Sequence, residues 1–223
     1  MPLVSAKDVA ARLGVNAQRV RALAAQGRLP GSKVANRWLF DSELLHDHQI
    51  RGRSGGRPFS QPHALGLLYV ASGEDASWLS EYDKWRLRRY LPRLAKLVPL
   101  LRARAQSALL RAPDSLVRRL LRDPRVVRSG VSAASDYGAD ISARGVVEFY
   151  CVGAYAEQLA HRYALRAVPE ASANLILHRV KWQEPLSRRS VMPVGVVACD
   201  LADAADSRTR RAGRSLLQQL GGR

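Results

Sequence analysis

The sequence is short of cysteine, lysine and acidic side chains, and it contains no long apolar run. Only two cysteines, Cys151 and Cys199, occur in 223 residues. Both lie among apolar neighbours, so we expect buried free thiols rather than a disulfide. No apolar run approaches the ~20 residues that a membrane-spanning helix needs. The first residues also lack the apolar stretch of a signal peptide, which favours a cytoplasmic protein.

The shortage of acidic side chains leaves a strongly positive chain. Lys+Arg 36 against Asp+Glu 19 gives a formal net charge of +17, and only five of the basic residues are lysine. The excess is +6 over residues 1–57, +8 over 58–130 and +3 over 131–223. A charge of this size favours a polyanionic partner, either a nucleic acid or an acidic surface.

Composition divides the chain into two parts. Residues 51–58 contain three arginines, three glycines and a proline but nothing apolar, which is typical of a linker. We therefore predict one domain over residues 1–50 and a second over 59–223. The predicted fold class is mainly α: an N-terminal winged helix-turn-helix, then a domain that is helical at first and α+β towards its end.

Two short helices joined by a glycine-containing turn are predicted near the N-terminus. Ser5 and Asp8 have the spacing of a capping box, and Asn16 can cap the second helix. This arrangement is typical of a helix-turn-helix, whose second helix enters the major groove of DNA. Two β-prone pieces around Ala35-Asn36 then predict a hairpin, or wing, and a third helix is predicted over Ser42–Gln49.

Polar side chains on the outward face of the second helix are the candidate base contacts. Glutamine can pair with adenine, and arginine with guanine, through two hydrogen bonds at once. The candidates on this helix are Asn16, Gln18, Arg19 and Arg21. In the linker, extended arginines could enter a minor groove or could simply be solvated; they are Arg51, Arg53 and Arg57.

The N-terminal pattern resembles the excisionase/MerR-like winged helix domain. The resemblance covers about the first fifth of the chain, over Ser5–Asn16, Val20–Leu23, Gly27–Pro30 and Arg37–Ser42. Domains of this group bind DNA with the second helix and the wing. The resemblance therefore implies further contacts from Lys33, Asn36 and Arg37.

Helical periodicity continues after the linker and then gives way to strands. Helices are predicted near Pro62–Ala71, Trp78–Arg93, Ala95–Ala108 and Pro113–Arg122. From Val126 on, β-rich runs predict strands over Val146–Val152 and Asn174–Val180. Three further helices are predicted over Ala154–Leu165, Val194–Ala205 and Ser207–Leu220, the last capped by Ser207.

The basic region from Lys84 to Arg128 allows three interpretations. It could be a second DNA surface, a docking face for an acidic protein, or a solvated face. Trp78, Trp85 and Leu87 in and near this region are expected in the core rather than on a stacking platform.

No pattern in the sequence predicts catalysis or a metal centre. The side chains considered are His46, His48, His63, His161, His178, Asp200, Asp203 and Asp206. His46 and His48 lack further ligands at metal spacing, and His63, His161 and His178 are expected to be isolated. The three aspartates lie three residues apart at a helix end and are expected to face solvent. A nucleic-acid-processing enzyme would need a carboxylate or histidine cluster that the pattern does not show, so we expect no enzymatic activity and no cofactor.

The second part looks similar to the C-terminal part of AbiEi-type antitoxins. The similarity rests, in order, on Arg128–Ala134, Val147–Tyr150, Asn174–Val180, Pro193–Leu201, Asp206–Arg208 and Ala212–Leu217. Those proteins join an N-terminal winged helix to an α+β domain and act in type IV toxin–antitoxin operons, whose toxin is a nucleotidyltransferase-like protein. Many of them carry a winged helix of a different size from the excisionase-like one here.

This similarity implies a DNA-binding antitoxin and transcriptional autorepressor. Its partners would be double-stranded DNA at its own promoter and the toxin, with an oligomer possible on DNA. The alternative is a stand-alone transcription regulator or an excisionase-like recombination directionality factor.

Overall fold

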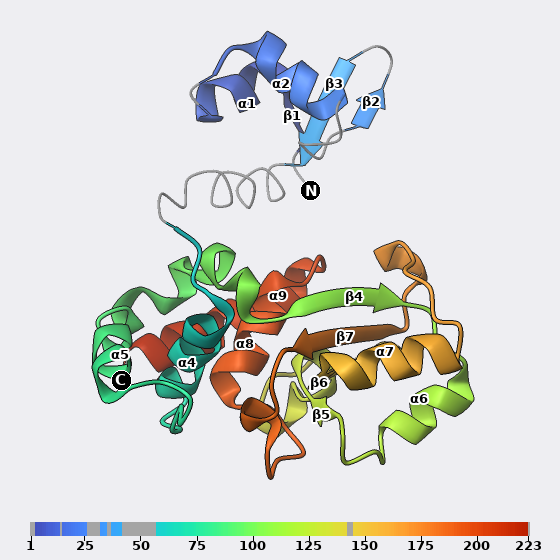
Figure 1. The fold of residues 1–223 in the computed structure, drawn as a ribbon. Coiled ribbons are helices and arrows are strands. Elements are labelled where there is room, and N and C mark those ends of the chain that lie inside the picture. The colour runs from blue at the N-terminus through green and yellow to red at the C-terminus, as the bar shows by residue number, and fades with distance from the viewer. Residues whose placement is uncertain are drawn as a thin grey trace. The chain divides into compact units, whose positions relative to one another are not determined.

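The structure is a computed structural model that describes residues 3–13, 15–25, 32–34, 37–41, 57–141 and 145–222. The chain divides into two units, residues 1–56 and 57–223, each with its own internal packing (Figure 1). The predicted third helix, Ser42–Gln49, and most of the predicted linker lie outside the described residues.

Two helices and a three-stranded antiparallel sheet form the first unit. The elements are β1 (Leu3–Ser5), α1 (Ala6–Leu13), α2 (Ala17–Ala25), β2 (Ser32–Val34) and β3 (Arg37–Asp41). The strand order is β1-β3-β2, and Val4 is paired with Phe40. β2 and β3 form the predicted hairpin. β1 was not predicted, because three residues are too few to show an alternating pattern.

Both predicted helix caps of the first unit are confirmed. The backbone N–H and the hydroxyl of Ser5 donate to Oδ2 of Asp8 at 3.1 and 2.7 Å, and the N–H of Asp8 donates to Oγ of Ser5 at 3.3 Å. At the start of α2, the N–H of Arg19 donates to Oδ1 of Asn16 at 2.7 Å. These side chains satisfy amide groups that have no partner within the helix.

A small apolar core holds the two helices against the sheet. Its buried residues are Val9 and Ala10 of α1, Val20 and Ala24 of α2, and Phe40 of β3. Because Val20 and Ala24 lie four residues apart, one side of α2 faces this core and the opposite side faces solvent.

A four-stranded mixed sheet forms the centre of the second unit. Its strands are β4 (Gln106–Leu110), β5 (Val127–Arg128), β6 (Val147–Val152) and β7 (Leu175–Val180), in the order β4-β7-β6-β5. β6 and β7 are parallel, and the two outer pairs are antiparallel. β6 and β7 form where the sequence predicted strands. The helix α7 (Gly153–Arg162) lies between them in the chain, as a parallel crossover requires.

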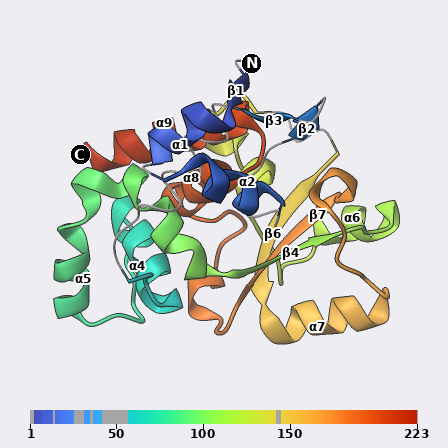
Figure 2. The same cartoon turned by 90° about the horizontal axis from the view of Figure 1, so that it is seen from above.

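Helices cover both faces of this sheet. Helix α6 (Asp114–Leu120) and helix α7 bury Leu116 and Leu159 against Phe149 and Leu177 on one face. The other face is covered by α4 (Gln61–Ala71), α8 (Val194–Asp203) and α9 (Ser207–Gly221). Figure 2 shows α7 on one side of the strands and α8 with α9 on the other.

The segment between α4 and β4 is the main departure from the predicted fold. Helix α5 spans only Glu81–Arg88, and the predicted helix Ala95–Ala108 is wrong. That stretch forms two 3₁₀ segments, Leu91–Lys96 and Val98–Arg104, and then β4. Each 3₁₀ segment has a proline in its first turn, and proline removes a backbone donor and disrupts a continuing α-helix.

The closing helices pack unusually closely, and glycine makes this possible. A Cβ atom on Gly195 of α8 would clash with the carbonyl oxygen of Leu68 in α4. A Cβ atom on Gly213 of α9 would clash with the backbone nitrogen of Ala202 in α8. Asp206, not Ser207, caps α9, because its carboxylate accepts the N–H of Thr209 at 2.7 Å.

Both cysteines are buried and free, as predicted. Burial raises the pKa of each thiol, Cys151 and Cys199, to about 12, which disfavours the reactive thiolate. Within the described ranges, no helix is both long and apolar enough to cross a membrane.

Candidate nucleic-acid interface

Helix α2 presents three of the predicted base contacts to solvent. Gln18, Arg19 and Arg21 are exposed, whereas Val20 between them is fully buried. The buried side anchors the helix, so its polar side can approach the edges of base pairs. The major groove is wide enough to admit an α-helix presented in this way.

Asn16 has a local structural role that competes with base reading. Its side chain is exposed, but its Oδ1 atom already accepts the N–H of Arg19 at 2.7 Å. Pairing with adenine through two hydrogen bonds would need that same oxygen as an acceptor. Asn16 therefore caps α2, and a base contact from it would have to share the Oδ1 atom with the cap or use the amide nitrogen.

The β2–β3 hairpin carries two further predicted contacts. Lys33 and Arg37 are both exposed. In the register of the two strands, Lys33 is opposite Trp38 and Val34 is opposite Arg37, so the two cations lie on neighbouring strands of one hairpin. Asn36, Arg51 and Arg53 lie outside the described residues, and Arg57 is exposed at the start of the second unit.

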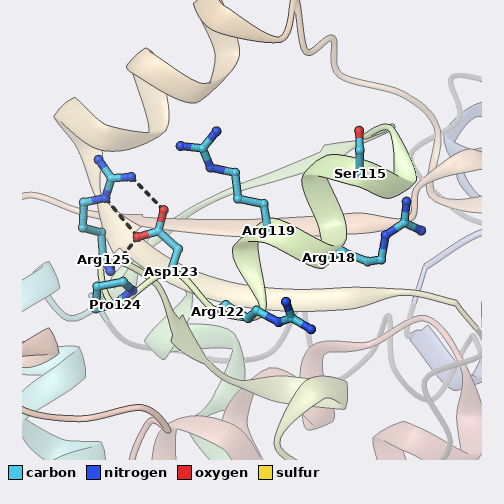
Figure 3. Close-up of a pocket in the computed structure, with 7 residues that line it drawn as sticks. All are labelled: Ser115, Arg118, Arg119, Arg122, Asp123, Pro124 and Arg125. Atoms are coloured by element: carbon cyan, nitrogen blue, oxygen red, sulfur yellow. Dashed lines mark hydrogen bonds and ion pairs between the residues drawn. The ribbon is translucent and has the colours of Figure 1, made fainter.

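Helix α6 and the turn that follows it line a cationic pocket of about 720 Å³. Its lining residues, drawn in Figure 3, are Ser115, Arg118, Arg119, Arg122, Asp123, Pro124 and Arg125. The first four follow a spacing of three and four residues, which places them on one side of a helix. Arg118, Arg119 and Arg122 have no acidic partner among the described residues, so this side carries uncompensated positive charge.

The acidic residue of this pocket is already neutralised. The Asp123 carboxylate accepts hydrogen bonds from the Arg125 guanidinium at 2.8 and 2.9 Å and from the Tyr155 hydroxyl at 2.5 Å. The hydrogen bond from Arg125 is the main reason that the pKa of Asp123 lies well below its usual range. Asp123 therefore positions Arg125 and leaves the pocket open to an anion.

Helix α5 exposes an aromatic pair, one member of which was expected in the core. Trp85 is 53 % exposed and Tyr82 is 64 % exposed, so the prediction for Trp85 is wrong. Trp78 and Leu87 do pack into the core, as predicted. Lys84 is buried, with its ammonium 2.6 Å from Asp75 and 2.7 Å from Glu81. The basic region Lys84–Arg128 is therefore not one continuous surface.

A buried polar network, not predicted from the sequence, lies between the sheet and α8. His178 of β7 has its Nδ1 atom 2.7 Å from Oγ of Ser107 and its Nε2 atom 2.7 Å from Oε1 of Glu148. Its ring stacks on Tyr150 with the centroids 4.6 Å apart. The other oxygen of Glu148 accepts the N–H of Val131 at 2.9 Å. The expectation that His178 is isolated is therefore wrong.

Asp200 joins this network from α8. Its Oδ1 atom accepts from Nε of Arg104 at 2.8 Å and from the hydroxyl of Tyr150 at 3.0 Å, and its Oδ2 atom accepts from Ser129 at 2.5 Å. Arg104 also donates to Asp203 at 2.9 Å. The expectation that Asp200 faces solvent is wrong, because α8 is covered by neighbouring elements along most of its length.

The charges of the network balance one another. Burial alone would lower the pKa of His178, but the charge of Asp200 and the hydrogen bond to Glu148 outweigh it, so the pKa is raised. Burial, reinforced by the charge of Asp200, raises the pKa of Tyr150 well above its usual value. The imidazole of His178 is therefore more easily protonated than a free imidazole, and the phenol of Tyr150 stays protonated.

Glu148, His178 and Asp200 offer ligand atoms within 4.8 Å of one another, a spacing that could hold a metal ion. However, the hydrogen bonds described above already use the ligand atoms of all three. The Arg104 guanidinium beside Asp200 would also repel a cation. The arrangement fits a network that ties β4, β6, β7 and α8 together, rather than a metal centre.

Residues 3–53 match a protein family described as a helix-turn-helix domain. The match includes α1, α2 and the β2–β3 hairpin, and it lies within the first unit. No curated protein and no solved structure shows a match to the chain. The chain therefore carries an N-terminal DNA-binding helix-turn-helix, as predicted, and this domain suggests a DNA-binding regulator.

Proposed function

We propose that this protein is a transcription regulator that reads duplex DNA through a winged helix-turn-helix. The observation that carries the proposal is the outward placement of Gln18 and Arg19 on the second helix of the domain. In this proposal α2 enters the major groove, where Arg19 donates to guanine and Gln18 pairs with adenine. The β2–β3 hairpin acts as the wing, and Lys33 and Arg37 bind phosphates. The experiment that tests it is the Arg19 substitution described in the Discussion.

Further contacts are proposed from the sequence pattern. Asn36 would extend the wing contact, and the arginines of the arm would follow the DNA backbone or a minor groove; these are Arg51, Arg53 and Arg57. Arg21 would complete the basic side of α2. The activity proposed is binding alone, without catalysis or a cofactor. The buried network around Asp200 supports this, because its charged side chains are already paired with one another and are not free to act on a substrate.

The pocket beside α6 supports a second, sequence-independent contact with the DNA backbone. Arg118, Arg119 and Arg122 are exposed and have no acidic partner among the described residues, and the guanidinium fork matches the geometry of a phosphate. The pocket has no aromatic or large aliphatic lining, which a protein-docking surface would need as an anchor.

The double variant Arg118→Gln, Arg122→Gln should therefore flatten the dependence of DNA affinity on salt. The slope of log K against log salt should fall by about 0.9 for each phosphate that the variant no longer neutralises. Fluorescence anisotropy on one promoter fragment over a salt series measures it. The matched control, Arg166→Gln with Arg211→Gln, removes the same charge from exposed positions elsewhere. Equal slopes for the two double variants would exclude α6 from the DNA interface.

We further propose that the second unit neutralises a toxin and that the whole protein represses its own operon in the cytoplasm. The proposed antitoxin role is supported by the similarity of residues 128–217 to the C-terminal part of AbiEi-type antitoxins. The partner would be a nucleotidyltransferase-like toxin encoded next to this gene. The alternative, a stand-alone regulator or an excisionase-like recombination directionality factor, predicts no such neighbour.

Residues 58–223, expressed from an unrelated promoter, should rescue growth when the neighbouring toxin gene is induced. The reason is that the sheet and both apolar cores of the second unit lie within this segment. Full-length protein carrying Arg19→Ala should rescue equally well, although it binds DNA weakly. Rescue by residues 1–57 alone would place neutralisation in the first unit and contradict the proposal. No rescue by a folded 58–223 fragment together with none by the full-length variant would overturn the antitoxin role.

A further inference from the structure

Helix α5 presents an aromatic pair to solvent that none of the contacts proposed above uses. The rings of Tyr82 and Trp85 stack with centroids 6.0 Å apart and an angle of 25° between their planes. Leu87 and Lys84 on the opposite side of the helix are buried, so the fold holds this pair outward. Neighbouring exposed aromatics on a rigid helix are typical of an interaction surface.

Arginines accompany both rings. The Arg86 guanidinium carbon lies 5.7 Å from the centroid of Tyr82, and that of Arg89 lies 5.8 Å from the centroid of Trp85. All four side chains are exposed. Tryptophan, tyrosine and arginine are the residues most enriched among those that dominate binding energy at protein interfaces. The composition of this surface therefore fits a protein partner.

The charges along α5 are arranged so that the surface complements itself. Glu81, Trp85 and Arg89 are spaced by four residues and form one ridge, with the acid at the start, the tryptophan in the middle and the arginine at the end. Glu81 has 81 % of its side chain exposed, and its Oε1 atom lies 2.7 Å from the Lys84 ammonium. Lys84 also pairs with Asp75, so these three side chains keep a net negative charge that can attract a cation of the second copy. If two copies of this ridge pack antiparallel with Trp85 on the two-fold axis, each Glu81 faces the Arg89 of the other copy. The dipoles of the two antiparallel helices also attract each other.

We propose that α5 is the contact surface of a homodimer in which the two α5 helices pack antiparallel around Trp85. A two-fold interface of this kind is closed and needs only one self-complementary surface. A polyanion fits the ridge less well, because Glu81 lies at one end of it. A dimer would supply two helix-turn-helix domains, as binding to two half-sites requires. The proposal does not depend on the antitoxin role or on DNA being the ligand.

The α5 ridge lies far from the cationic pocket of α6 within the second unit. Figures 1 and 2 both place α5 at one end of the second unit and α6 at the other. The cationic pocket and the α5 ridge can therefore be changed separately. Arg118→Glu on α6 serves as a control that reverses one exposed charge away from α5.

The test is analytical ultracentrifugation of the full-length protein and a set of charge exchanges. Glu81→Arg alone and Arg89→Glu alone place like charges opposite each other, so each variant should dimerise several-fold to about tenfold more weakly than the unchanged protein. An equimolar mixture of the two variants restores both attractive pairs and should dimerise as well as the unchanged protein. The double variant, with both exchanges in one chain, should do the same.

Trp85→Ala should raise the dimer dissociation constant by about 30-fold or more, since this variant lacks the anchor on the axis. Arg118→Glu should leave it unchanged. Circular dichroism checks that each variant is folded. In Glu81→Arg, the buried Lys84 keeps its second acidic partner, Asp75. A monomer across the whole soluble concentration range of the unchanged protein would overturn the proposal. The proposal would also be overturned if a mixture of the Glu81→Arg and Arg89→Glu variants failed to restore association. A Trp85→Ala variant that dimerises as well as the unchanged protein would overturn it too.

Discussion

Replacing Arg19 by alanine should weaken promoter binding by ~1–3 kcal/mol, about 5- to 150-fold, and relax the base preference at one position of the site. The side chain is exposed on α2, and the helix cap uses only its backbone N–H, so the domain should keep its fold. The effect is large because a bidentate contact to guanine carries both affinity and discrimination.

Quantitative gel shifts on promoter and scrambled DNA measure this effect. Lys7→Ala is the matched control, since Lys7 is an exposed cation on α1 of the same unit. It should weaken binding to both DNAs alike, by a contribution that depends on salt. Unchanged affinity and unchanged preference in the Arg19 variant would mean that α2 does not read bases in the proposed way.

Replacing Arg104 by methionine should lower the free energy of unfolding of the second unit by about 3–5 kcal/mol. The guanidinium side chain is 4 % exposed and its partner Asp200 is fully buried. Removing the cation leaves the carboxylate hydrogen-bonded only to the neutral donors Ser129 and Tyr150. A buried carboxylate that has lost its hydrogen-bonded cationic partner is strongly unfavourable.

Urea denaturation followed by tryptophan fluorescence measures the change, because Trp78 and Trp182 pack at the core of this unit. Arg102→Met is the matched control: Arg102 pairs with Asp203 at 3.4 Å and its side chain is 49 % exposed. That control should cost less than about 1 kcal/mol. Adding Asp200→Asn to Arg104→Met should recover part of the stability. Similar destabilisation by Arg104→Met and Arg102→Met would contradict the structural role assigned to the buried pair.

Features that depend on near neighbours in the chain were predictable. The caps by Ser5, Asp8 and Asn16 follow from a spacing of three residues, so they form wherever the helices form. The outward side of α2 follows from the 3.6-residue period of Val20 and Ala24. Strands β6 and β7 follow from apolar runs of strand length. The base contacts themselves remain a prediction, since exposure is necessary for reading DNA but does not demonstrate it.

Features that depend on which side of an element is covered were decided by the tertiary structure. Asp200 is buried because α4 and α9 pack beside α8, and only then do Arg104 and Tyr150 meet it from distant parts of the chain. Trp85 has the same hydrophobicity as Trp78, yet it faces solvent because nothing described packs over that side of α5. The chain from Gln106 became β4 because β7 offers it hydrogen-bonding partners. The sequence by itself determined the starts of α1 and α2, the two central strands and the basic charge. Burial and strand pairing depend on residues tens of positions away, so only the assembled fold determined the polar network and the exposed ridge on α5.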